Sequence, residues 1–160
     1  MDFTFTDDQL LFCKSVQEFL QQEVTPAAVR QSWELDTGRN EERWQQLVNL
    51  DFVLLAQACG QVALPEPLVE TTLVATPLLA TLAQRDSRCA SLLEKIATGE
   101  RKVAIGHAAN NLVCDAHIAD FLLLPSGNQI HLVPRDQVKL AAQESVDPSR
   151  RLFAVEWSAN

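Results

Sequence analysis

Apolar residues recur every three or four positions up to Gly99, a spacing that is typical of amphipathic helices. One such stripe consists of Phe12, Val16, Phe19 and Leu20. After Gly99 the pattern changes to short apolar runs that are separated by turn residues, which favours strands. The chain therefore reads as a helical half followed by a β half.

Capping residues mark where the helices of the first half begin. Thr6 precedes an acidic first turn, and Gln9 completes a capping box for a helix that extends to about residue 23. Thr25-Pro26 predicts a second helix, with the threonine as cap and the proline in the first turn. Asn40 is expected to cap a third helix, which carries Trp44 on its apolar face.

Prolines divide the rest of the helical half. Pro65 and Pro67 are incompatible with one continuous helix, so a new helix is expected from Pro67, with Pro77 as a kink or boundary. Residues 87–98 form another amphipathic helix that ends at Gly99. Its inward-facing residues are expected to be Leu92, Leu93 and Ile96.

Strands are expected in the second half, with a hairpin at its centre. The runs with strand character are residues 102–107, 121–124, 130–133, 138–142 and 152–155. Residues 125–128 read as the hairpin turn, because Gly127 and Asn128 tolerate a positive φ. The predicted fold class is α+β, with an N-terminal helical domain over residues 1–99 and a small antiparallel β-sheet or barrel domain over residues 100–160.

Charge and cysteine usage narrow the range of partners. The 160 residues carry a net charge of −8, which argues against nucleic acid and anionic membrane surfaces as main partners. No apolar run is long enough for a membrane-spanning helix, and the acidic start does not resemble a signal peptide. The four scattered cysteines are typical of reduced thiols, which predicts a cytoplasmic protein.

Residue spacing alone identifies no catalytic or metal site. Cys114 and His117 form only half of a metal-ligand pattern, and no nucleotide-binding or hydrolase motif occurs. Arg150 and Arg151 either bind an anion or, as we favour, are solvated or paired with Glu144 or Glu156.

Several stretches, taken in order over nearly the whole chain, resemble the acyl-CoA dehydrogenase family. The opening residues 1–26 look like the start of such an enzyme, as does Trp44-x-x-Leu47-Val48-x-Leu50 in the third helix. Residues 60–68, GQVALPEPL, are similar to the segment after the family's long N-terminal helices, and ADFLLL at 119–124 and DPSRR at 147–151 are similar to its middle β domain. The resemblance is strongest to divergent bacterial members, including mixed-subunit enzymes that act on bulky acyl chains such as steroid side chains.

The resemblance implies an oxidoreductase of fatty acid or steroid side-chain degradation. Such enzymes convert an acyl-CoA to the 2,3-enoyl-CoA: a glutamate removes the α proton, and the β hydrogen leaves as hydride to FAD. It also implies a dimer or larger oligomer of acyl-CoA dehydrogenase-type subunits. The glutamate belongs to a C-terminal helical bundle, so no residue up to Asn160 is expected to be catalytic.

The chain departs from the family at the expected flavin contacts. Residues 104–109 stand where the family has its Thr-Glu-Pro and Gly-Ser-Asp motif, which assigns His107 to the cofactor surface. Residues 112–115 match the family's Trp-Ile-Thr-Asn segment, with Leu112 in place of the aromatic residue and Cys114 in place of the threonine. The segment between Leu54 and Ala58 is also shorter than in the family.

Two hypotheses follow from the resemblance. The chain is either part of an FAD-dependent acyl-CoA dehydrogenase that is incomplete as a catalyst on its own, or a degenerate, non-catalytic subunit that supports a flavin-bearing partner. Without the bundle, apolar helix faces around Trp44 and Leu73 are expected to be exposed and to drive association.

Overall fold

The computed structural model describes residues 6–47 and 58–159. The chain divides into two compact units, residues 1–65 and residues 66–160. The predicted boundary between residues 99 and 100 lies inside the second unit, at the change from helices to strands, and as a domain boundary it stays a prediction. None of the described helices is long and apolar enough to cross a membrane.

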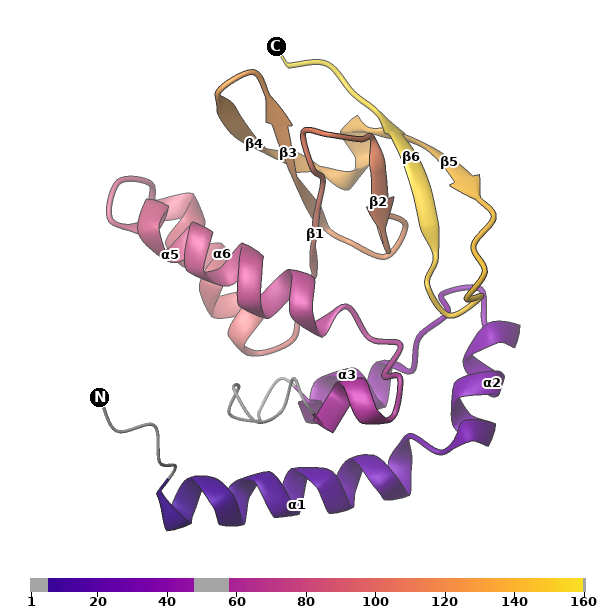
Figure 1. The fold of residues 1–160 in the computed structure, drawn as a ribbon. Coiled ribbons are helices and arrows are strands. Elements are labelled where there is room, and N and C mark those ends of the chain that lie inside the picture. The colour runs from indigo at the N-terminus through magenta and orange to yellow at the C-terminus, as the bar shows by residue number, and fades with distance from the viewer. Residues whose placement is uncertain (1–5, 48–57, 160) are drawn as a thin grey trace. The chain divides into compact units, whose positions relative to one another are not determined.

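The first unit contains the helices α1 (Asp7–Glu23), α2 (Pro26–Glu34) and α3 (Glu41–Leu47) (Figure 1). Their starts follow the predicted caps: the Thr25 side chain accepts from the Ala28 N–H, and Asn40 Oδ1 accepts from the Arg43 N–H at 2.9 Å. The sequence also predicts a hydrophobic staple between Phe5 and Leu10, a prediction that lies outside the described residues because residue 5 does. Local chemistry therefore sets where these helices begin.

The second unit begins with three helical elements. A π-helix, η1 (Val69–Ala75), runs directly into α5 (Thr76–Ala83), and α6 (Ser87–Ala97) follows after a short turn. The predicted boundary at Pro77 is thus confirmed, since this proline lies in the first turn of α5. The predicted end at Gly99 is also confirmed, because Gly99 has a φ of +73°.

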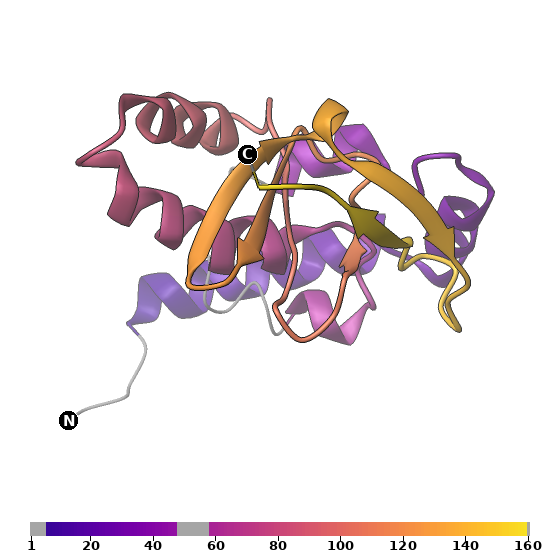
Figure 2. The same cartoon turned by 90° about the horizontal axis from the view of Figure 1, so that it is seen from above.

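Two three-stranded sheets make up the rest of the second unit. The order β1 (Val103–Ile105), β3 (Phe121–Ser126), β4 (Gln129–Pro134) forms one sheet, and the order β2 (Leu112–Cys114), β6 (Leu152–Glu156), β5 (Lys139–Gln143) forms the other. A short 3-10 turn, η2 (Arg135–Gln137), separates β4 from β5. Figure 2 shows the β3–β4 hairpin in orange from above. The α+β fold class is confirmed, although β1 and β3 pair in parallel, which the residue pattern did not indicate.

The hairpin turn is tighter than predicted. Ser126 pairs with Gln129, so only Gly127 and Asn128 lie between the strands. Gly127 has a φ of +57°, whereas Asn128 does not have a positive φ. A positive φ at the first central residue alone is the pattern of a type II′ turn.

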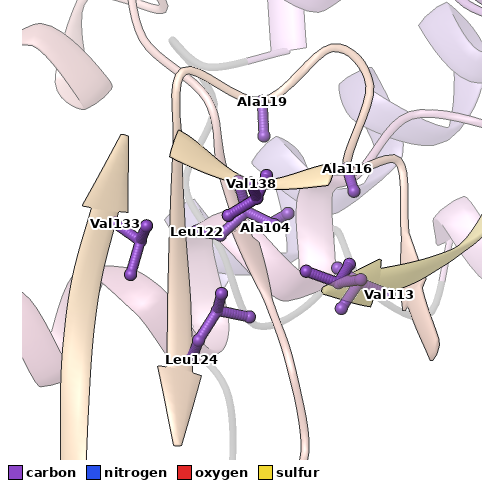
Figure 3. Packing of buried hydrophobic residues seen from close by; sticks show 9 residues of the cluster. Ala104, Val113, Ala116, Ala119, Leu122, Leu124, Val133 and Val138 are labelled. Atoms are coloured by element: carbon purple, nitrogen blue, oxygen red, sulfur yellow. The ribbon is translucent and has the colours of Figure 1, made fainter. Parts of the chain in front are cut away.

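Strand β3 is buried on both faces over residues 122–124, which explains the continuous apolar run at its start. Leu123 packs with Leu79, Leu92 and Ile96 of the helices. Leu122 and Leu124 point the other way, into a second cluster with Val113 and Val138 (Figure 3). Successive side chains of β3 therefore point into two different hydrophobic clusters of the unit. Because Val113 belongs to the cluster with Leu122 and Leu124, β2 lies on the face of the sheet that is opposite to the helices.

Candidate functional site

The connection between β1 and β2 forms a structured turn around His107. His107 and Asn110 make an antiparallel bridge, and the Ala109 N–H donates to His107 Nδ1 at 3.1 Å. The Leu112 N–H donates to Asn110 Oδ1 at 3.0 Å. Because Nδ1 accepts, a neutral His107 carries its proton on Nε2, and the Asn110 amide keeps its NH₂ group for another partner. The turn thus presents two hydrogen-bond donors in fixed positions.

His107 and Asn110 both line a cavity of about 220 Å³ in the second unit. Buried Val113, Leu124 and Val155 form its apolar part. The remaining lining residues come from the turn and the strand ends: Gly106, His107, Ala108, Asn110, Asn111, Pro125 and Trp157. The volume is below the roughly 300–1,000 Å³ of typical small-molecule sites, so the cavity accommodates a small group rather than a whole cofactor.

Gly106 is required by the close packing beside this cavity. A Cβ at this position would lie 2.8 Å from Leu124 Cδ2 and 3.5 Å from Val113 Cγ2. The Gly106 N–H donates to the Leu123 carbonyl oxygen, which holds the backbone against β3. A larger residue would therefore displace the leucine that forms part of the cavity wall.

The other two predicted cofactor contacts lie on a different surface. Successive side chains of a strand point to opposite faces, so Leu112 and Cys114 share the face of β2 that is opposite to Val113. Among the described residues that line the cavity, neither of these two is present, whereas His107 is. Leu112 is 39% exposed and Cys114 is half-buried. The structure thus separates His107 from the pair Leu112 and Cys114.

Cys114 belongs to a small polar cluster with Arg150. The Cys114 Sγ lies 3.9 Å from Arg150 Nη2, and the same nitrogen lies 3.4 Å from Glu70 Oε1. The contact with Cys114 raises the pKa of Arg150 above its ordinary value; burial opposes this effect, and the charges of Glu70 and Asp115 add to it. Arg150 thus pairs with Glu70 and not with the predicted Glu144 or Glu156.

Sequence reasoning missed most of the cavity lining. The sequence pattern assigned no site role to Asn110, Asn111 or Trp157, all of which line the cavity. The Trp157 ring lies 5.2 Å from the His131 ring, and the His117 ring lies 4.7 Å from the Phe153 ring.

In the described part of the chain, no group of three or more His, Cys, Asp or Glu side chains is arranged to hold a metal ion.

No family model matches the sequence, and no curated protein is significantly similar to it. Solved structures do match. A variant of the Tcur3481-Tcur3483 steroid ACAD has a TM-score of 0.75 at 16% identity, over 96% of this chain and 55% of that one. The ChsE4-ChsE5 complex from Mycobacterium tuberculosis has a TM-score of 0.67 at 18% identity, over 96% and 59%.

A glutaryl-CoA dehydrogenase from Mycobacterium smegmatis, solved in complex with FADH2, is also similar, with a TM-score of 0.57 at 12% identity over 94% of this chain and 52% of that one. The chain therefore has an acyl-CoA dehydrogenase fold over most of its length. It spans little more than half the length of these proteins.

Proposed function

We propose that this chain is part of an FAD-dependent acyl-CoA dehydrogenase and is incomplete as a catalyst on its own. The observation that carries the proposal is the fold match over 96% of the chain to a steroid acyl-CoA dehydrogenase. The order of the family-like segments in the sequence agrees with that match. The substrate would be an acyl-CoA thioester with a fatty acyl or steroid side chain, and the four free thiols are consistent with a cytoplasmic protein.

We expect Leu112 and Cys114 to contribute one wall of a flavin site and not a complete site. Leu112 offers an exposed apolar surface beside Cys114, of the kind that can cover a planar ring. The cavity at His107 is too small for a dinucleotide, and its lining contains no arginine or lysine to neutralise a pyrophosphate. The rest of an FAD site would have to come from residues outside this wall or from another subunit.

The same cavity lacks a carboxylate that could act as the glutamate base of the family. Its lining includes no aspartate or glutamate, and Glu70, the carboxylate that contacts Arg150, is paired with that arginine. A base that removes a proton from the α carbon must reach that proton directly. We therefore expect the base to be supplied by a C-terminal bundle or a partner chain in a homo- or hetero-oligomer.

A non-catalytic partner subunit is the alternative. It is favoured by Leu112 and Cys114, which replace the aromatic residue and the threonine of the family's flavin segment. It is also consistent with the similarity to a structure that is itself described as a complex, ChsE4-ChsE5.

A flavin titration of the purified chain tests the choice. If the chain supplies a flavin wall, it should quench FAD fluorescence saturably. Leu112→Asp should weaken this binding. Ile130→Asp is the control at an exposed apolar position on β4, and it should leave the binding unchanged. A colourless chain that does not bind FAD would favour the non-catalytic subunit. Turnover of any acyl-CoA by the chain alone, with an artificial electron acceptor, would contradict the proposal that it is incomplete.

A further inference from the structure

The first unit contains a larger groove between α2 and the residues that follow Gly60. Its volume is about 510 Å³, which lies within the range of small-molecule sites. The lining residues all belong to this unit: Gln21, Val24, Thr25, Pro26, Val29, Arg30, Trp33, Gln61, Val62 and Ala63.

The groove combines an apolar floor with one cation. Buried Val24 and half-buried Val29 and Val62 contribute aliphatic surface, and Trp33 is 40% exposed at the edge. Arg30 is the only charged residue in the lining, and no carboxylate in the described part of the chain pairs with it. A cation beside apolar surface favours a ligand with an anionic head group over one with a cationic head group.

The wall opposite α2 is held in an unfavourable backbone conformation. Ala63 has a φ of +49°, in the left-handed region that residues with a Cβ rarely adopt. The Ala63 N–H donates to the Gly60 carbonyl oxygen at 3.4 Å, and the Leu64 N–H donates to the Cys59 carbonyl oxygen at 3.1 Å. Strain of this kind concentrates at ligand sites, where the surrounding structure maintains it.

We propose that this groove binds a small amphiphilic anion, with an aliphatic chain along Val29 and Val62 and a carboxylate at Arg30. The Gln21 and Gln61 amides lie in the same lining and can donate to the carboxylate. This site lies in the first unit, whereas the flavin wall lies in the second, so the inference goes beyond the proposed function and does not depend on it.

Calorimetric titration of the whole chain with decanoate and with decyltrimethylammonium, both below their micelle concentrations, tests the charge selectivity. Decanoate should bind with one-to-one stoichiometry, and the cation at least tenfold more weakly. Arg30→Gln should weaken decanoate binding about tenfold, the loss expected for one charge-assisted hydrogen bond, and Arg30→Lys should restore part of it. Arg85→Gln is the matched control, because it makes the same charge change at an exposed position after α5. In amide spectra, Val62 and Ala63 should shift on binding.

Three results would overturn the proposal. The first is the absence of saturable decanoate binding. The second is that the chain binds decyltrimethylammonium as tightly as decanoate, or that the Arg30→Gln chain binds decanoate as tightly as the unmodified chain. The third is that the chain forms a dimer and that increasing concentrations of decanoate dissociate this dimer. Such a result would mean that the groove normally binds a second copy of this chain.

Discussion

The Thr71 side chain donates a hydrogen bond to the backbone carbonyl oxygen of Val103 at 3.1 Å. Both residues are 1% exposed, and they join the π-helix η1 to the first strand of the sheet. The Thr71 carbonyl oxygen also accepts from the Thr76 hydroxyl at 2.9 Å, a hydrogen bond that links η1 to the first residue of α5. One buried polar residue thus fixes the irregular helix to β1.

Thr71→Val should lower the free energy of unfolding by about 2 kcal/mol, because it leaves a buried carbonyl without this donor while it preserves side-chain shape. Chemical denaturation measures the loss. Thr81→Val is the matched control: its hydroxyl is exposed and bonds to the Pro77 carbonyl oxygen, so its cost should stay within about 0.5 kcal/mol. Equal losses of unfolding free energy in both variants would show that the buried Thr71 hydrogen bond contributes no more to stability than the exposed one of Thr81.

Gly106→Ala should cost about 1–3 kcal/mol, because the new Cβ would overlap the buried Leu124 side chain. A double-mutant cycle with Leu124→Val should show a smaller cost in the trimmed background. Gly60→Ala is the control, since nothing lies within 4 Å of its would-be Cβ. If the two glycine substitutions cost the same, steric overlap is not the cause.

Ala63→Gly should raise the free energy of unfolding by about 1 kcal/mol, since glycine adopts the left-handed conformation without a steric penalty. The same substitution at Ala80, inside α5, should have the opposite sign, because glycine in a helix costs roughly 1 kcal/mol relative to alanine. Thermal denaturation of both variants distinguishes the two signs. If Ala63→Gly lowered the stability of the chain, the inference that the backbone at Ala63 is strained would be wrong.

Leu73→Glu should weaken self-association of the chain. The sequence led us to expect exposed apolar faces around Trp44 and Leu73, but Trp44 is fully buried, so that part of the expectation is wrong. Leu73 is 43% exposed, beside Val69 and Val74 on η1, which retains an apolar surface suited to an interface. Sedimentation over a concentration series measures the effect, and Ile130→Glu is the control at an exposed position on the hairpin. A monomer at every concentration in the unmodified chain would contradict the prediction.

Stability should fall at alkaline pH in part because of Cys89. Burial raises the pKa of this thiol above its ordinary value, so the unfolded chain loses the proton first as the pH rises. The contribution is present in full below the unfolded pKa, near 8.5, and is lost as the pH rises through the folded pKa. In a plot of the denaturation midpoint against pH, Cys89→Ala should make the decline at alkaline pH less steep than in the unmodified chain.

The features that sequence reasoning predicted correctly depend on neighbours in the chain. Thr25 and Asn40 cap helices through residues three positions away, and Gly99 ends a helix through its own φ. The residue pattern over Val69–Ala75 did not distinguish a π-helix from an α-helix. The parallel pairing of β1 with β3 was missed because it joins segments that are distant in sequence. The pairing of Arg150 with Glu70 was missed for the same reason.

The candidate site, too, was predicted only in part from the sequence. The family resemblance assigned His107, and the structure places it at the cavity. Leu112 and Cys114 lie on another face because residues 112–114 form a strand, with only Val113 directed into the core. Identifying that strand in the sequence would have separated the two surfaces, but a run of three residues carries too little alternation to be recognised.

The pairing of β2 with β6 has a consequence for how the chain acquires its structure. Leu112 is matched with Ala154, whereas β3 is matched with β4 across a two-residue turn. During synthesis the hairpin can form soon after residue 134 emerges, but β2 has no strand partner until Leu152–Glu156 are available. Until then the Val113 face remains uncovered by its own sheet, and contacts between distant residues form slowly. A chaperone that acts on this protein would therefore be needed most in the interval between the completion of β4 and the arrival of β6.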